Sequence, residues 1–238
     1  MNVLDNVDIN HIKQKLYERL KPSGWADKLK SFLLSDDFTK ILLFLLKDAR
    51  EGKRFTPVLK QVFRAFEECP YNDLKIVMIG QDPYPQKEVA DGIAFSCANT
   101  GKPEASMRYM FKEIENTVYK DGYSWDPDLK RWSNQGILLI NTAFTTTIAK
   151  VGTHYDVWRP FMAFLLDTIA FQNPGLIYVF MGKKAQEWMV SIPDNNYLLT
   201  CMHPAAAAHS HSERWDSGDI FNKINNISKK QFGTEIVW

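Results

Sequence analysis

Lys75-Ile-Val-Met-Ile-Gly-Gln-Asp-Pro-Tyr-Pro85 joins a short apolar run directly to a polar turn. The run from Lys75 to Ile79 is rich in β-branched residues and has no helical period, which predicts a buried strand. Gly80 lets the backbone turn, and Pro83 ends any ladder because proline has no amide hydrogen. The carboxylate of Asp82 therefore follows the carboxyl end of a buried strand, where open α/β sheets place their ligands. Taken alone, the same residues also fit a simple turn.

Apolar runs of the same kind predict three further buried strands. They lie at 136–140, 176–180 and 197–201. A shorter extended piece is expected at 92–96, and polar residues follow each of the three runs. Apolar residues at helical spacing predict helices before and between the strands. The expected helices are 9–20, one starting at 25, 36–50, 58–66, 107–118, 158–171 and 220–227.

Caps and alternation complete the predicted architecture. Asp8 is the expected N-cap of the first helix, and Asp36 or Asp37 is the expected N-cap of the third. Strands that alternate with helices predict a parallel sheet covered on both faces. The fold class is therefore α/β, with a single-domain three-layer α/β/α architecture over residues 1–238 and a central four-stranded parallel sheet.

Composition restricts the setting in which this chain works. The 238 residues carry a formal net charge of +1, so binding to nucleic acid would need a local basic patch. Cys69, Cys97 and Cys201 lack paired spacing, which favours a reducing compartment over a disulfide framework or a zinc site. The first residues do not read as a signal peptide, and the longest apolar run, 41–46, is too short to span a bilayer. We therefore expect a cytoplasmic protein with no membrane partner.

Polar residues follow all four predicted strands. Gln81 and Asp82 follow the first, Asn141 the second, Lys183 the third and His203 the fourth. Because right-handed crossovers bring parallel strand ends to one edge, these side chains should meet in one crevice. Each has an ordinary explanation as a turn former, cap, helix start or loop histidine. Together they predict a functional site.

Four segments carry a resemblance to a known family. Gly80-Gln-Asp-Pro-Tyr84, Gly92-Ile-Ala-Phe95-Ser, Leu138-Leu-Ile-Asn141-Thr and His203-Pro204 resemble, in order and spacing, the signature segments of family 1 uracil-DNA glycosylases. The resemblance runs from Trp25 to Trp238, and related families carry a different residue at the position of Asp82. It implies a monofunctional hydrolase that breaks the N-glycosidic bond of uracil in DNA, starts base-excision repair and lacks lyase activity. It implies no cofactor and no metal.

The resemblance assigns roles to the residues at the strand ends. Asp82 would position and activate water and balance the positive charge that develops on the sugar. His203 would donate a hydrogen bond to the uracil carbonyl, a form of oxyanion stabilisation. The carboxamide of Asn141 can match the N3–H and O4 edge of uracil, a pattern that cytosine reverses. Phe95 would stack on the base, Tyr84 would exclude a thymine methyl, and the backbone at Gln81 would hold the other carbonyl.

DNA contacts are expected from four loops. The residues concerned are Pro83, Ser106, Lys183, Pro204, Ala205 and Ala207. Here the chain departs from the family, because Ala207 stands where a bulky leucine commonly enters the base stack. Loss of this wedge predicts a preference for single-stranded DNA, since flipping a base from a duplex costs a few kcal/mol. His209 and His211 follow closely and are candidates to replace it.

Two other functions are considered. The first is a non-catalytic uracil-DNA-binding or replication-accessory protein on the same fold. The second is an unrelated α/β hydrolase or nucleotide-binding protein, which lacks a glycine-rich phosphate loop or a Gly-x-Ser-x-Gly elbow in this sequence. The expected partners are uracil-containing DNA and a DNA-mimic glycosylase inhibitor protein, whose binding the missing wedge should weaken. The protein is expected to be a monomer.

Overall fold

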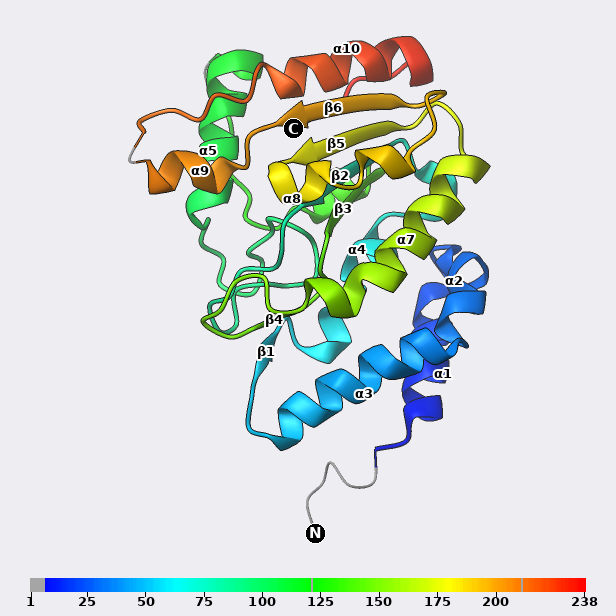
Figure 1. Cartoon of the computed structure of the whole chain (residues 1–238). Coiled ribbons are helices and arrows are strands. Elements are labelled where there is room, and N and C mark those ends of the chain that lie inside the picture. The colour runs from blue at the N-terminus through cyan, green and yellow to red at the C-terminus, as the bar shows by residue number, and fades with distance from the viewer. Residues whose placement is uncertain (1–6, 121, 211) are drawn as a thin grey trace.

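A computed structural model describes residues 7–120, 122–210 and 212–238 (Figure 1). Four parallel strands form the central sheet in the order β3-β2-β5-β6. They span Ile76–Gly80 (β2), Ile137–Asn141 (β3), Ile177–Met181 (β5) and Tyr197–Cys201 (β6). Every residue of β2, β3 and β5 is buried, whereas β6 at the sheet edge is partly exposed. This burial explains why the inner strands are continuous apolar runs.

Ten helices surround the sheet in the described part of the chain. They are α1 (Ile9–Leu20), α2 (Trp25–Leu33), α3 (Asp36–Arg50), α4 (Arg64–Glu68), α5 (Ala105–Ile114), α6 (Lys130–Ser133), α7 (Tyr155–Gln172), α8 (Lys183–Gln186), α9 (Pro204–His209) and α10 (Ile220–Phe232). In Figure 1, α10 lies on one side of the sheet, and α7 lies on the other with α3, α2 and α1 beyond it. The predicted three-layer α/β/α fold is confirmed.

A second, two-stranded sheet was not predicted. It pairs β1 (Phe55–Thr56) with β4 (Thr146–Thr147) in antiparallel fashion. Each strand has only two residues, which is too short for a periodic signal. This small sheet ties the segment before β2 to the long loop after β3.

Three local expectations were wrong. Ser35, not Asp36 or Asp37, caps α3, and its hydroxyl accepts from the Phe38 amide at 3.2 Å. Residues 58–66 form a short 3₁₀ turn followed by α4 rather than one helix. Residues 92–96 form a turn rather than an extended piece, because Phe95 has a positive φ of 66°. The reason for that turn is a buried carboxylate described below.

The three cysteines are free and buried. In the described ranges, no helix combines the length and apolar character needed to cross a membrane.

Candidate active site

The ends of β2 and β3 bring the predicted residues together. Gly80 pairs with Asn141 in the parallel register, so the loops that leave both strands start side by side. The Thr142 hydroxyl donates to the carbonyl oxygen of Gln81 at 2.6 Å, and the Thr142 amide donates to Gly80 at 3.2 Å. These bonds fix the direction in which Asp82 leaves the sheet.

Asp82 is held from the opposite loop by a backbone amide. Gly152 donates to Oδ2 of Asp82 at 2.6 Å. Burial raises the pKa of the Asp82 carboxyl to about 6, and the Gly152 amide opposes the rise because it stabilises the charged form. The carboxylate is therefore mostly ionised at neutral pH and becomes protonated under mildly acidic conditions.

The loop that carries Gly152 is itself fixed by buried side chains. The hydroxyl of Thr145 lies 2.8 Å from Nδ1 of His154 and accepts from the Trp158 indole at 2.7 Å. Burial lowers the pKa of His154, so this ring stays neutral. The sequence argument did not identify Gly152, because its contribution is a backbone amide that depends on how this loop folds.

A glycine at position 80 leaves room for a flat ligand. A Cβ at Gly80 would lie 2.5 Å from Oδ1 of Asn141 and 2.8 Å from Cζ of Phe95. The amide of Asn141 and the ring edge of Phe95 thus meet over the missing side chain. Asn141 is 9% exposed and Phe95 is 6% exposed, so both are held within the protein and reach the crevice with few atoms.

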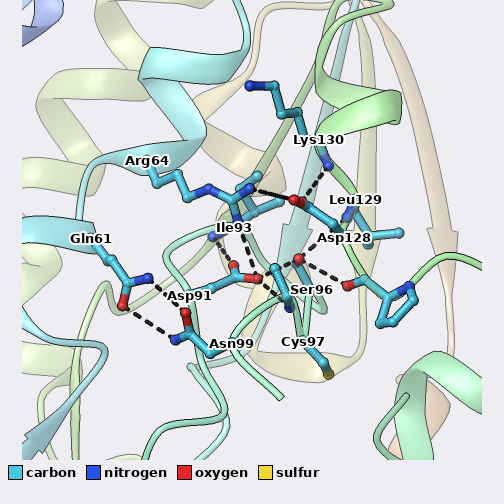
Figure 2. Close-up of polar contacts among 12 residues, drawn as sticks. Gln61, Arg64, Asp91, Ile93, Ser96, Cys97, Asn99, Asp128, Leu129 and Lys130 are labelled. Carbon is cyan, nitrogen blue, oxygen red and sulfur yellow. Dashed lines mark hydrogen bonds and ion pairs between the residues drawn. The ribbon is translucent and has the colours of Figure 1, made fainter. Parts of the chain in front are cut away.

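Phe95 is held in its left-handed conformation by the carboxylate of Asp91. This carboxylate is 0% exposed and accepts from the Ile93 amide at 3.0 Å, the Ser96 hydroxyl at 2.6 Å and the Ala98 amide at 2.8 Å. Three donors on one acid close the turn around Phe95 (Figure 2). A non-glycine residue at positive φ is uncommon and persists where the surroundings impose it.

Arg64 compensates the charge of Asp91 from α4. Its guanidinium lies 3.1 Å from Oδ2 of Asp91 and also donates to both oxygens of Asp128 at 2.8 Å, as Figure 2 shows. Nearby acids hold the pKa of Arg64 above its usual value despite burial. The sequence argument missed Arg64 and Asp91. Asp91 stands directly before one of the motifs, which is the one signal that could have found it.

Tyr84 closes the other side of the same turn. Its hydroxyl donates to the carbonyl oxygen of Phe95 at 3.2 Å. Burial raises the pKa of this phenol well above its usual value, so it remains a neutral donor. The two aromatic residues expected to shape a base pocket are therefore connected by a direct hydrogen bond.

His203 faces Phe95 from the start of α9. Its Nδ1 accepts from the Ala205 amide at 3.2 Å, which leaves the proton of the neutral ring on Nε2. The ring centroids of His203 and Phe95 are 5.6 Å apart. Gly182 permits this position, because a Cβ there would lie 2.7 Å from Cβ of His203 and its φ is +91°. The fourth strand end therefore joins the other three.

The residues expected to contact DNA differ in exposure. Lys183 is exposed and Ala205 is partly exposed, whereas Pro83, Ser106 and Pro204 are buried. Any contact from these three would have to use few atoms.

Ala207 does not project from the surface. It is 4% exposed in α9, which packs against α5, and Ala206 is the exposed alanine of this helix. The structure therefore does not place a side chain at 207 where it could enter a base stack. His211 and the side chain of His209 lie outside the described residues.

Comparisons with known proteins agree with this geometry. Residues 66–228 match the family model described as the uracil DNA glycosylase superfamily. The chain belongs to this superfamily. The curated uracil-DNA glycosylase of Borreliella burgdorferi is 33% identical over 76% of this chain and 82% of its own length. That of Campylobacter lari is 29% identical, covering 90% and 93%.

Solved structures of uracil-DNA glycosylases share the fold. The mimivirus uracil-DNA glycosylase has a TM-score of 0.82 at 24% identity and covers 93% of this chain and 88% of its own. A mimivirus UNG variant in complex with UGI has a TM-score of 0.81 at 25% identity, covering 90% and 87%. The superfamily match includes all four strand ends described above.

Proposed function

We propose that residues 1–238 form one uracil-DNA glycosylase domain of family 1 that hydrolyses the N-glycosidic bond of uracil in DNA. The products are free uracil and an abasic site, the first step of base-excision repair inside the cell. The observation that carries this proposal is the meeting of Asp82, Asn141, Phe95 and His203 around the missing side chain of Gly80. The curated relatives named uracil-DNA glycosylase support it.

Base recognition would rest on Asn141, Phe95 and Tyr84. The base stacks on the Phe95 ring while the carboxamide of Asn141 pairs with N3–H and O4 of uracil. Cytosine presents the reversed donors and acceptors and would leave buried groups unpaired, a discrimination of roughly 10⁴-fold or more. Tyr84, which is hydrogen-bonded to Phe95, would occupy the space that a thymine methyl needs.

His203 would stabilise the leaving base. The bond from Ala205 to Nδ1 leaves Nε2–H as the donor, so a neutral imidazole can bind the carbonyl oxygen as negative charge develops on uracil. A donor fixed in advance needs no reorganisation during the reaction. The backbone at Gln81 would hold the second carbonyl oxygen.

Asp82 would serve the sugar and the water. Its charge would balance the oxocarbenium-like sugar, and one oxygen would orient the attacking water while Gly152 holds the other. These residues include no lysine amine, so we expect direct hydrolysis without a covalent intermediate and without strand cleavage. No metal or cofactor has a step in this scheme.

The DNA grip is proposed to be weak on duplexes. Helix α9 presents alanines at 205–208, and the side chain of Ala207 is buried, so no bulky residue of this segment can fill a vacated stack. We therefore infer a preference for single-stranded DNA. The same absence should weaken a DNA-mimic inhibitor of the type found with the mimivirus relative. We further infer that the protein acts as a monomer.

The decisive experiment measures free uracil released from a single-stranded oligonucleotide with a chelator present. The unsubstituted protein and an Asp37→Asn variant, altered on the exposed start of α3, should both release uracil. Asp82→Asn should lose activity by several orders of magnitude. Tight binding of uracil DNA without release would instead favour the accessory-protein function.

A further inference from the structure

A basic groove lies beside the candidate active site. It has a volume of about 800 Å³ and runs between the end of α3, the β1 segment and the loop that follows Pro85. Lys53, Arg54, Lys60 and Lys87 line it, together with Glu88 as the single acid of the lining. Since the whole chain has a net charge of only +1, this is a local concentration of positive charge.

Two of these four cations carry uncompensated charge. Lys53 pairs with Asp48 at 3.1 Å and Glu51 at 2.8 Å, and Lys87 pairs with Glu88 at 3.1 Å. Arg54 and Lys60 are exposed, and neither forms an ion pair within the described ranges. The groove therefore presents two cations able to take an anionic partner without first losing an internal one.

Backbone bonds connect the groove to the catalytic loop. The Ile148 amide donates to the Arg54 carbonyl at 2.8 Å, and the next residue, Ala149, donates to the Pro85 carbonyl at 2.8 Å. Pro85 is three residues beyond Asp82, and Lys87 follows two residues later. The small β1–β4 sheet thus places the groove next to the end of the catalytic loop (Figure 1).

The groove also exposes apolar surface. Val58 is 49% exposed and Leu59 is 37% exposed, and Phe55 beside them is partly buried. Nucleotide strands combine a charged backbone with flat apolar base faces, and proteins bind them with cations and apolar or aromatic platforms together. A purely electrostatic counter-ion site would not need this apolar floor.

We propose that this groove binds the single-stranded flank of the uracil-containing strand as it leaves the catalytic crevice. Arg54 and Lys60 contact phosphates, and the apolar floor contacts bases without reading sequence. This inference rests on the proposed function and adds a second, extended binding surface to it. It supplies the local basic patch that a nearly neutral protein needs in order to hold DNA.

The test compares two oligonucleotide lengths. One has about 4 nucleotides and the other about 20, which exceeds the roughly 4–16 nucleotides that one single-strand site covers. An Arg54→Gln/Lys60→Gln double variant should lose about tenfold in kcat/KM on the long substrate at low salt, at about threefold for each phosphate contact. The short substrate should be cleaved unchanged, and the salt dependence on the long substrate should be shallower by about 0.7 per contact.

A matched control removes two charges elsewhere. Lys223→Gln/Lys230→Gln alters two exposed lysines of α10, on the far side of the sheet in Figure 1, and should behave like the unsubstituted protein on both lengths. Equal losses on short and long DNA, no loss on either, or the same loss in the control would overturn the proposal. Polarisation binding of both oligonucleotides keeps the test independent of catalysis. Absence of uracil release from the short substrate would count against the proposed function instead.

Discussion

At the scale of single residues, Asp82 determines the pH dependence. Its pKa is raised to about 6, and the proposed mechanism requires the ionised form. The kcat/KM for single-stranded substrate should therefore be constant above pH about 7 and fall about tenfold for each unit below pH about 6. An acid limb centred near pH 4 would contradict the buried carboxylate.

The same carboxylate should cost the protein stability. Because the folded pKa of about 6 exceeds the unfolded value of about 3.9, the folded state binds the proton more tightly and ionisation opposes folding. This cost is absent below pH about 4 and complete above pH about 6. Asp82→Asn should therefore raise the free energy of unfolding by about 1–2 kcal/mol at pH 7.5 and hardly change it at pH 4. Denaturant unfolding at both pH values measures the difference.

At the scale of elements, the turn around Phe95 depends on Asp91. Asp91→Asn keeps the shape but removes the charge that faces Arg64 and weakens one of three acceptor contacts. Leaving Arg64 partly uncompensated should cost about 3 kcal/mol of stability, and kcat/KM should fall at least tenfold. The fall should come with loss of inhibition by free uracil, while affinity for abasic DNA is retained.

Asp128→Asn is the matched control for the Phe95 turn. It alters the outer partner of Arg64, which makes no contact with the turn in Figure 2. It should destabilise the protein without changing inhibition by free uracil. If both variants lose uracil inhibition equally, the turn is not positioned by Asp91.

Helix α9 offers two neighbouring alanines in opposite environments. Ala207→Leu should destabilise the protein by about 1–3 kcal/mol, because the larger side chain must enter the packed contact with α5. Ala206→Leu lies on the exposed side and should change stability by less than about 0.5 kcal/mol. Thermal unfolding of both variants checks this. Equal stabilities would mean that position 207 is accessible.

At the scale of the whole molecule, the strand preference combines the missing wedge with the basic groove. Duplex substrate must be opened at a cost of a few kcal/mol that no bulky side chain of α9 offsets. We expect kcat/KM on single-stranded uracil DNA to exceed that on a matched duplex by at least tenfold. Comparable rates on the two substrates would show that another part of the protein performs the wedge function.

Much of the fold could be predicted because three of the four strands are buried on both faces. Such strands must be apolar along their whole length, so β2, β3 and β5 are visible as runs without help from distant residues. Parallel order then brings the strand ends together. For this reason the sequence placed Asp82, Asn141 and His203 in one crevice before any coordinate was known.

The remaining features depend on contacts between residues far apart in the chain. The turn at Phe95 needs Asp91 and Arg64, the position of Asp82 needs the amide of Gly152, and the burial of Ala207 needs α5. Local sequence thus determined the strands, the parallel sheet and the chemical groups at its edge. Tertiary structure decided their orientation, the accessible side of α9 and the basic groove, because backbone donors and buried charges act only after distant segments have been packed together.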